Sequence, residues 1–585
     1  MFLHEAAMPY CYLDTERKKV VIKITVPKST KGVSIVYGDP FEYVKTNDKN
    51  ELGDNIWIWK NHTQKLQKQF FGGSLEMWKI ELDIPIRRRM KYGFVIEQLD
   101  GETVYFNENG AEPYSASVIT KPHNHFYFPF IHEVDAIQLP KWAESVSWYQ
   151  IFPDRFHNGD ASINPPNCEE WEDGVPKHRN FFGGDIRGII MKLPYLKKLG
   201  ITGIYLTPVF ESPSNHKYDT SDYLAIDKHF GSIQDFKELV AKAHKNGMKV
   251  MMDAVFNHAG AKHPFWQDVL KNQEKSAYKD YFHIKSFPVK EEYANNEKPN
   301  FDTFAFTPRM PKWNTENPAA RKYLIDAALF WVNECDIDAW RLDVSDEVSF
   351  SFWREFHTAL KNAKPDIYIL GELWHNPSKW LSGGYFDAVM NYPLGRVIRD
   401  FFIAKELTAE SFGEKLMKNL IKHSDIHSKI QFNLLDSHDT PRALTLAGGC
   451  KKSLKNAFIF MMFMKGAPCI YYGTEVGMDG RGDPDCRKPM VWNEKKQDKV
   501  LYRFFWELLK LRKKYETLIQ NASIEYRHVK GMHYWHLSVR KKKATIAYND
   551  GNENNEVDGR ILISSSGMNG YIAPKSAAVY AELVD

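Results

Sequence analysis

The sequence lacks the features that mark disulfide-bonded, metal-clustered and membrane-spanning proteins. Its 6 cysteines are scattered and no two form a CxxC pair, which argues against a redox motif or a cysteine metal site. No apolar stretch reaches the roughly 18 residues that suggest a membrane span. The N-terminus has no basic region followed by a long apolar run. We therefore expect no secretory signal, and a cytoplasmic protein with free thiols.

An excess of charge of one sign is also missing. Lys and Arg total 78 against 74 for Asp and Glu, which gives a net charge of +4 over 585 residues. This balance predicts neither nucleic-acid binding nor membrane binding. A chain of this length is too long to fold around one ordinary hydrophobic core. It predicts roughly two to four domains, one of which can be a large barrel.

The two ends of the chain have the patterns of β domains. Residues 1–124 predict an N-terminal β-sandwich, because β-rich runs such as VVIKITVP (20–27) and KYGFVIEQ (91–98) alternate with turn residues. The segment 125–142 is interpreted as a linker. Residues 503–585 predict a C-terminal all-β domain, in which the long helix LYRFFWELLKLRKKYETL leads into short strands that end with AAVYAEL.

The middle of the chain, residues 125–502, alternates apolar runs with amphipathic helical segments. One such helix is expected between an N-cap at Ser232 and a stop at Gly247. The apolar runs are SVSWYQIF (145–152), ITGIYLTPVF (201–210), MKVMMDAVF (248–256), IDAWRLDV (337–344), IYILGELW (367–374), AVMNY (388–392), IQFNLLDSHD (430–439) and APCIYYGTE (467–475). Eight such units predict an α/β fold of the (β/α)8 TIM-barrel type. The connection after the third run is too long for a crossover, so residues 259–312 are expected to form an inserted domain.

Polar and charged residues gather at the predicted carboxyl ends of these strands, where the active site of such a barrel lies. The set comprises His216, Tyr218, Asp253, Asn257, His258, Arg341, Asp343, Glu372, Trp374, His438 and Asp439. Burying a charged group beside apolar strands destabilises the fold unless the group is paired, so unpaired groups of this kind suggest a functional role. Carboxylates from several strands that converge with an arginine and histidines are difficult to explain by structure alone. We therefore interpret this end of the barrel as a catalytic site.

Cleavage of a glycosidic bond suits this set of residues. The reaction needs one carboxylate as nucleophile or base and one protonated carboxyl as acid. Asp343 and Glu372 end adjacent predicted strands, and Arg341 is placed to keep Asp343 ionised. In a cluster of acids Glu372 is the candidate proton donor. Sequence spacing leaves retention or inversion open, because that outcome depends on the distance between the two carboxyls.

The sequence contains four short motifs that resemble those of the α-amylase family, in the family's usual order. They are DAVFNH (253–258), WRLDVSDEV (340–348), GELWH (371–375) and LLDSHD (434–439). With the insertion and the segments HKYDTSDY (216–223), MPKWN (310–314) and DPDCRKPM (483–490), the chain is similar to the cyclomaltodextrinase, neopullulanase and maltogenic amylase group. The resemblance covers essentially the whole chain.

This resemblance implies a retaining double displacement on the α-1,4-glucosidic bonds of cyclodextrins, maltodextrins and pullulan, with some transglycosylation and α-1,6 cleavage. Asp343 is implied as nucleophile, Glu372 as general acid and base, and Asp439 as the carboxylate that holds the distorted sugar. The residues implied to bind substrate are His216, Tyr218, Asp253, Asn257, His258, Arg341, Trp374, Tyr392, His438, Asp483 and Arg487.

Two alternatives share this barrel, namely an oligo-α-glucosidase and a non-catalytic glucan-binding relative. The presence of all three carboxylates argues against the second. One departure from the group concerns specificity, because Val344-Ser345-Asp346-Glu347 stands where Val-Ala-Asn-Glu is usual. We expect the additional carboxylate of Asp346 to change which sugars bind on the acceptor side of the site, and with it the balance of α-1,4 and α-1,6 cleavage.

The resemblance also implies a structural calcium ion. The segments NGDASIN (158–164) and GGD (183–185) are similar to the group's calcium site, with ligands at Asn158, Asp160, Asn164, Gly183 and Asp185. Ile163 and Asn164 replace the usual polar and acidic residues. The site therefore carries less negative charge, and we expect weaker binding of Ca2+, away from the chemistry.

The N-terminal domain resembles the starch-binding-like domain that supports homodimers in this group. There, the N-terminal domain of one subunit caps the active site of the other. This implies a homodimer with a narrow cleft that favours cyclodextrins and short maltodextrins over starch.

Overall fold

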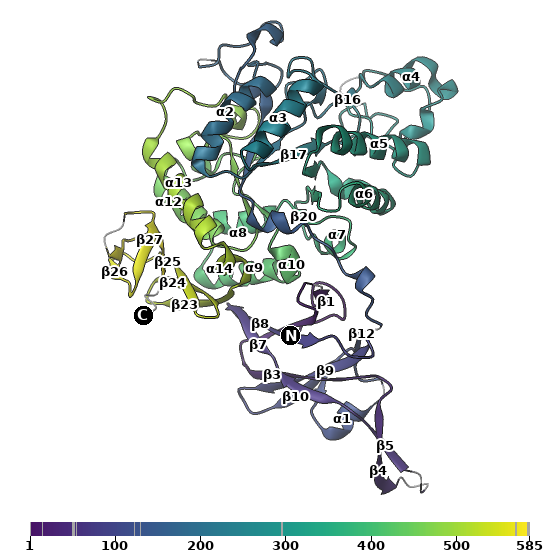
Figure 1. Ribbon diagram of the computed structural model, residues 1–585, viewed down its shortest axis with the longest axis vertical. Coiled ribbons are helices and arrows are strands. Elements are labelled where there is room, and N and C mark those ends of the chain that lie inside the picture. The colour runs from purple at the N-terminus through teal and green to yellow at the C-terminus, as the bar shows by residue number, and fades with distance from the viewer. Residues whose placement is uncertain are drawn as a thin grey trace.

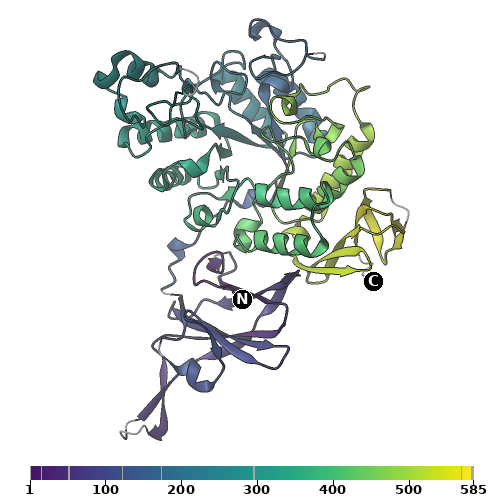
Figure 2. The same ribbon diagram turned by 180° about the vertical axis from the view of Figure 1, so that it is seen from behind.

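The computed structural model describes residues 2–581 apart from residues 15, 50–52, 54, 122, 129, 173, 294–296, 568 and 569. A central barrel with its helices lies above an N-terminal β domain and beside a C-terminal β domain in Figure 1, and Figure 2 shows the same arrangement from behind. Among the described residues, no helix combines the length and the apolar character needed to cross a membrane.

The barrel is built from eight parallel strands, as predicted. Their order in the sheet is β20-β19-β18-β17-β14-β13-β22-β21, and a parallel bridge between Met390 and Phe432 joins the two ends. The strands are β13 (Trp148–Ile151), β14 (Gly203–Leu206), β17 (Lys249–Ala254), β18 (Ala339–Leu342), β19 (Tyr368–Gly371), β20 (Ala388–Val389), β21 (Phe432–Asn433) and β22 (Ala467–Tyr471). The (β/α)8 prediction is confirmed.

Several strands are shorter than predicted. The second run ends at Leu206, and Phe210 belongs to a separate hairpin of β15 (Phe210–Glu211) with β16 (Asp222–Ile226). The sixth run was expected to reach Tyr392, but that residue begins helix α8 (Tyr392–Phe402). The reason is local, because the Asn391 side chain caps the helix by accepting from the Leu394 N–H, and a proline follows at the second helical position.

The helices around the barrel include α2 (Ile186–Leu199), α3 (Ile233–Lys245), α5 (Pro318–Cys335), α6 (Phe350–Ala363) and α12 (Lys451–Met462). Helix α3 begins with a capping box, in which Ser232 accepts from the Asp235 N–H and the Asp235 side chain accepts from the Ser232 N–H. Its N-cap is therefore where the sequence predicts it. The helix ends at Lys245, shortly before the expected stop at Gly247.

Outside residues 294–296, the inserted segment after β17 contains helix α4 (Pro264–Asn272) and two short 3-10 turns, Gln273–Lys275 and Lys279–Tyr281. Isolated antiparallel bridges tie it to the barrel, at His258 with Lys312 and within it at Phe282 with Trp313. These bridges bring residues 301–313 back to the carboxyl end of β17. The insertion therefore forms one side of the barrel mouth.

The N-terminal domain packs two sheets against each other around a shared apolar core. One sheet contains β1 (Cys11–Asp14), β2 (Lys19–Pro27), β8 (Leu75–Asp83) and β7 (Gln67–Gly72). The other contains β3 (Thr30–Gly38), β6 (His62–Lys65), β9 (Met90–Gln98), β10 (Thr103–Asn107) and β11 (Gly110–Pro113). A hairpin of β4 (Tyr43–Lys49) and β5 (Asn55–Trp59) projects from its far end (Figure 1).

The predicted linker needs a correction. Its first part forms β12 (Phe126–Phe128), which pairs with β9 and so extends the N-terminal sheet. The cause is aromatic packing, because the Phe126 ring contacts Tyr92 and Phe94 in the core of that domain. A strand that buries its aromatic side chain is held to the domain, not free to serve as a linker.

The C-terminal region begins with two helices where one was expected. Helix α13 (Lys499–Lys514) is followed by α14 (Glu516–Asn521), with the break at Tyr515. The strands of its main sheet are β23 (Ser523–Val529), β24 (Met532–Val539), β25 (Lys542–Asn549), β27 (Arg560–Ser564) and β29 (Ser576–Ala581), and β26 (Asn555–Glu556) pairs separately with β28 (Tyr571–Ile572). The last two residues of the predicted run AAVYAEL lie outside the described residues. β23 pairs in parallel with β7, so one nine-stranded sheet joins the two end domains, which the sequence did not predict.

Candidate active site

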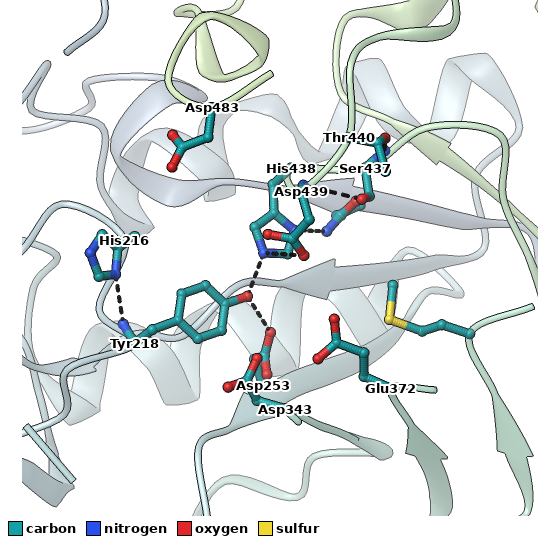
Figure 3. A network of polar contacts seen from close by, with 12 residues as sticks. His216, Tyr218, Asp253, Asp343, Glu372, Ser437, His438, Asp439, Thr440 and Asp483 are labelled. Carbon is teal, nitrogen blue, oxygen red and sulfur yellow. Dashed lines mark hydrogen bonds and ion pairs between the residues drawn. The ribbon is translucent and has the colours of Figure 1, made fainter. Parts of the chain in front are cut away.

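The predicted site residues come together at the carboxyl ends of the barrel strands, around a cavity of about 450 Å³. The predicted residues that line this cavity are His216, Tyr218, His258, Asp343, Glu372, Trp374, Asp439, Asp483 and Arg487. Figure 3 shows Asp343 and Glu372 on one side of the site and Asp439 on the other, with the Tyr218 ring near Asp253 and His438. A cavity with converging polar groups of this kind is the expected form of a small-molecule site.

Arg341 organises the floor of the cavity. Its side chain is completely buried, and its Nη1 lies 2.7 Å from Asp343 Oδ1 and 2.9 Å from Asp253 Oδ1. Its Nη2 lies 2.9 Å from Glu372 Oε2. A planar guanidinium fixes the directions of its partners. One arginine therefore orients the carboxyls at the ends of β17, β18 and β19.

The protonation of this cluster follows from its burial. Burial raises the pKa of Asp343 well above its usual range, the guanidinium of Arg341 opposes that shift, and the charges of Glu372 and Asp253 add to it. The pKa of Asp253 is also raised, again by burial first. More carboxyls than guanidinium groups meet here, so the cluster favours holding a proton. The raised pKa favours a proton on Asp343 itself, and Arg341, which lowers that pKa, is the group that favours the ionised form needed for nucleophilic attack.

Glu372 is held by contacts from both sides. Its Oε2 accepts a 2.9 Å hydrogen bond from the Val344 N–H, and its Oε1 accepts one of 3.2 Å from Trp374 Nε1. Val344 has φ 44°, a left-handed conformation that is unusual for a β-branched residue. This turn directly after Asp343 aims the Val344 N–H at Glu372. The backbone beside the candidate nucleophile therefore helps to position the candidate acid.

The Tyr218 and His438 rings lie next to the carboxyl cluster around Arg341. They stack with centroids 5.5 Å apart, and Tyr218 Oη lies 2.6 Å from His438 Nε2 and 2.9 Å from Asp253 Oδ2. Burial lowers the pKa of His438 well below its usual range, so the ring is neutral. The amide of Gln150 donates to His438 Nδ1 at 2.7 Å, which leaves the ring proton on Nε2, facing the cavity side.

Asp439 lies on the opposite side from Asp343. Its Oδ2 is 3.2 Å from His438 Nε2 and its Oδ1 is 3.4 Å from Arg487 Nη2. Arg487 also contacts Asp483 at 3.0 Å. Burial first, and then the charge of Glu372, raise the pKa of Asp439 to about 7.

Five predicted residues lie beside the cavity without lining it, namely Arg341, Asp253 and His438, which are described above, and Tyr392 and Asn257. Tyr392 is buried beneath Trp374, and their rings stack with centroids 3.6 Å apart. Its hydroxyl lies 3.2 Å from Ser437 Oγ. Asn257 is buried and accepts a hydrogen bond from Lys312 Nζ.

Sequence reasoning missed the residues that the insertion contributes. Phe304 and Met310 line the cavity, and the Phe304 ring stacks on His258 with centroids 5.0 Å apart. Met310 begins the MPKWN segment that the sequence had marked, so a signal existed for it. Phe304 lies in an irregular loop, where no periodic pattern indicates orientation. Tyr205, which donates to Asp253 Oδ2 at 2.6 Å, was also missed.

The five predicted calcium ligands also come together, in a loop cluster before α2. Asn158 Nδ2 donates to Asn164 Oδ1 at 3.0 Å, and Gly183 lies against both side chains. Asp185 caps α2, and its oxygens accept from the Gly188 and Asp160 N–H groups at 2.6 and 2.7 Å. The oxygen donors match what Ca2+ prefers. Some of these oxygen atoms already accept hydrogen bonds from the protein. Within the described ranges, no three His, Cys, Asp or Glu side chains gather as a metal site.

Comparison with known proteins agrees with this geometry. The family described as the alpha amylase catalytic domain matches residues 150–548, and the alpha amylase N-terminal ig-like domain matches residues 1–132. A cyclomaltodextrinase of Geobacillus thermopakistaniensis is 47% identical over 83% of this chain and 79% of its own length. An intracellular maltogenic amylase of Bacillus subtilis is 44% identical over 87% and 83%. A solved structure of a cyclomaltodextrinase, 37% identical, superposes with a TM-score of 0.87 over 99% of both chains.

Proposed function

Because this chain belongs to the alpha-amylase family of glycoside hydrolases, we propose that it cleaves α-1,4-glucosidic bonds in cyclodextrins, maltodextrins and pullulan with retention of configuration. The observation that carries the proposal is the contact of one buried guanidinium, Arg341, with both Asp343 and Glu372. This contact fixes the orientation of the Asp343 carboxylate and of the Glu372 carboxyl, the proposed proton donor, relative to each other at the cavity wall. General acid catalysis and nucleophilic attack then act on the same bond.

In the first step, an Asp343 oxygen attacks the anomeric carbon of the bound glucose unit. Glu372 gives its proton to the glycosidic oxygen as the bond to that oxygen breaks. The leaving sugar departs with a free hydroxyl, and a glycosyl ester remains on Asp343. The hydrogen bonds of Val344 and Trp374 to Glu372 keep its carboxyl aimed at the leaving oxygen.

In the second step, the Glu372 carboxylate takes a proton from a water molecule. The resulting oxygen attacks the anomeric carbon, the ester bond to Asp343 breaks, and the sugar product leaves with its original configuration. A sugar hydroxyl in place of water gives transglycosylation. Asp439 and His438 are proposed to hold hydroxyls of the same glucose unit, and the Tyr218 ring is its stacking surface.

The acceptor side is where this chain departs from its group. Asp346 lines the cavity, and its Oδ2 lies 2.9 Å from His375 Nε2. We propose that this pair contacts the leaving sugar and permits some α-1,6 cleavage. Homodimer formation through the N-terminal domain and cytoplasmic residence are part of the proposal. They are supported by the match of residues 1–132 to the family's N-terminal domain and by the intracellular relative.

Calcium binding is proposed as a structural feature. Asn158, Asp160, Asn164, Gly183 and Asp185 would hold the ion in the loop before α2, where it would tie two segments together. The mixture of amide and carboxylate oxygens supports the proposal. The hydrogen bonds that these groups already make support weak affinity. No step of the reaction involves this ion.

Product analysis tests the proposed function. Purified protein is incubated separately with β-cyclodextrin, pullulan and soluble starch. We expect fast ring opening of cyclodextrin to maltose and glucose, and panose from pullulan. Faster attack on starch than on cyclodextrin would reject the narrow cleft and the capped dimer. Absence of attack on all three would reject the activity.

A further inference from the structure

A second pocket lies on the far side of the segment that carries Arg487. Its volume is about 430 Å³, close to the 450 Å³ of the catalytic cavity, and the two have no lining residue in common. Asp483 and Arg487 face the catalytic cavity, whereas Asp485 and Lys488 of the same segment face the second pocket. The two cavities are therefore neighbours across one short segment.

The lining of this pocket suits a sugar. Two tryptophans, Trp171 and Trp492, contribute to it. Trp171 Nε1 donates to the Met490 carbonyl at 3.0 Å, and Trp492 Nε1 donates to the Phe156 carbonyl. Because both indole N–H groups are already bound to the backbone, the rings are fixed in orientation. Lys192 Nζ lies over the Trp492 ring, 4.1 Å from its centroid, so what the two rings offer a ligand is the part of their apolar surface that lines the pocket.

The charges around the pocket argue against an ionic ligand. Lys488 Nζ lies 2.7 Å from Asp479 and 3.3 Å from Asp485, and Lys496 Nζ lies 2.7 Å from Glu172. Ammonium and carboxylate groups are thus interleaved and largely compensate each other. Such a rim presents many hydrogen-bond donors and acceptors without a strong field of one sign, which matches a neutral polyhydroxyl ligand.

From the aromatic lining, the mixed rim and the position beside the catalytic cavity, we propose that this pocket is a second binding site for an α-glucan, either a cyclodextrin or a segment of a longer chain. The inference rests on the proposed function. A chain held at both sites gains effective concentration at the catalytic cavity. Longer glucans therefore benefit from the second site, and a trisaccharide does not.

The test counts binding sites for β-cyclodextrin by calorimetry on the full-length Glu372→Gln protein, which does not consume the ligand. We expect two sites, and one site after Trp171→Ala. Val175 is 66% exposed and lies at the pocket, so Val175→Arg blocks the pocket without a risk to folding and is expected to have the same effect. Trp506→Ala is the matched control, because Trp506 is exposed on α13 and lines neither cavity, and it should keep both sites.

The outcomes separate the two proposals. A single site that persists in Trp171→Ala and Val175→Arg overturns the second site and leaves the proposed function standing. Two sites that both survive these changes also overturn it, because the second site would then lie elsewhere. No binding of β-cyclodextrin to the Glu372→Gln protein overturns the proposed substrate, and this inference with it.

Discussion

Replacement of Asp439 by asparagine should make the protein more stable at alkaline pH while it abolishes activity. Loss of hydration at the cavity raises the pKa of Asp439 to about 7, against 3.8 for an unperturbed aspartate, although the side chain keeps 28% of its surface in contact with solvent. The folded state therefore binds the proton more tightly than the unfolded state. The stability that this proton contributes is complete below about pH 4 and is lost as the pH rises through about 7.

The size of the effect follows from that shift. About three pKa units set an upper bound of roughly 4 kcal/mol on the destabilisation caused by ionised Asp439, and solvent screening of this partly exposed carboxyl lowers that figure. Asparagine has a similar shape and carries no charge, so it removes this cost. Arg487 loses an ionic contact of 3.4 Å but keeps Asp483 at 3.0 Å, so the net gain is smaller. We expect a gain of about 1 to 2 kcal/mol at pH 8 and none at pH 4.

Thermal unfolding of wild type and Asp439→Asn at pH 4, 6 and 8 measures this directly. We expect the two melting temperatures to coincide at pH 4 and to separate by about one or two degrees at pH 8, the variant being higher. Asp326→Asn, an exposed change on α5, is the control for a general effect of removing one acid. A variant that is no more stable than wild type at pH 8, or equally stabilised at pH 4, would refute the reasoning.

Three further predictions follow from the same geometry. Asp343→Asn and Glu372→Gln should fold normally and lower kcat by at least about a thousandfold, whereas near wild-type turnover on a natural α-glucan would reject their roles. Tyr218→Phe keeps the ring but loses the 2.9 Å hydrogen bond to Asp253, so kcat/KM should fall by about 10- to 100-fold; an unchanged value would show that the hydroxyl has no role. Ca2+ at ten times its Kd should raise the free energy of unfolding by about 1.4 kcal/mol, which is measured as a higher melting temperature. Asp160→Asn should remove this effect. If the variant still responds to Ca2+, the ion binds elsewhere.

The barrel and its catalytic end could be predicted because their signals are local. Asp343 and Glu372 directly follow strands β18 and β19, and Asp253 is the next-to-last residue of β17. Parallel strands of a barrel bring such positions to the same end. The α3 helix was found for the same reason, since its cap and its apolar face lie within one short segment.

The features that the sequence did not predict depend on long-range packing. Phe304 reaches the cavity only through the fold of an irregular insertion. The pairing of β7 with β23 joins Phe70 to Ile524, and no local pattern specifies a partner so distant in the chain. Tyr392 looked like the end of a strand, but a capping asparagine turned the backbone into a helix there. Tyr392 is the exception among these features, because its deciding contact is local and comes from the adjacent Asn391.

The stereochemistry of hydrolysis tests the central claim most directly. Maltotriose is mixed with the enzyme in an NMR tube, and the anomeric proton signals of the new reducing end are followed before mutarotation. The account predicts that the α-anomer appears first, and that no product appears with Asp343→Asn. Initial appearance of the β-anomer would contradict it, because Asp343 would then not form a covalent intermediate.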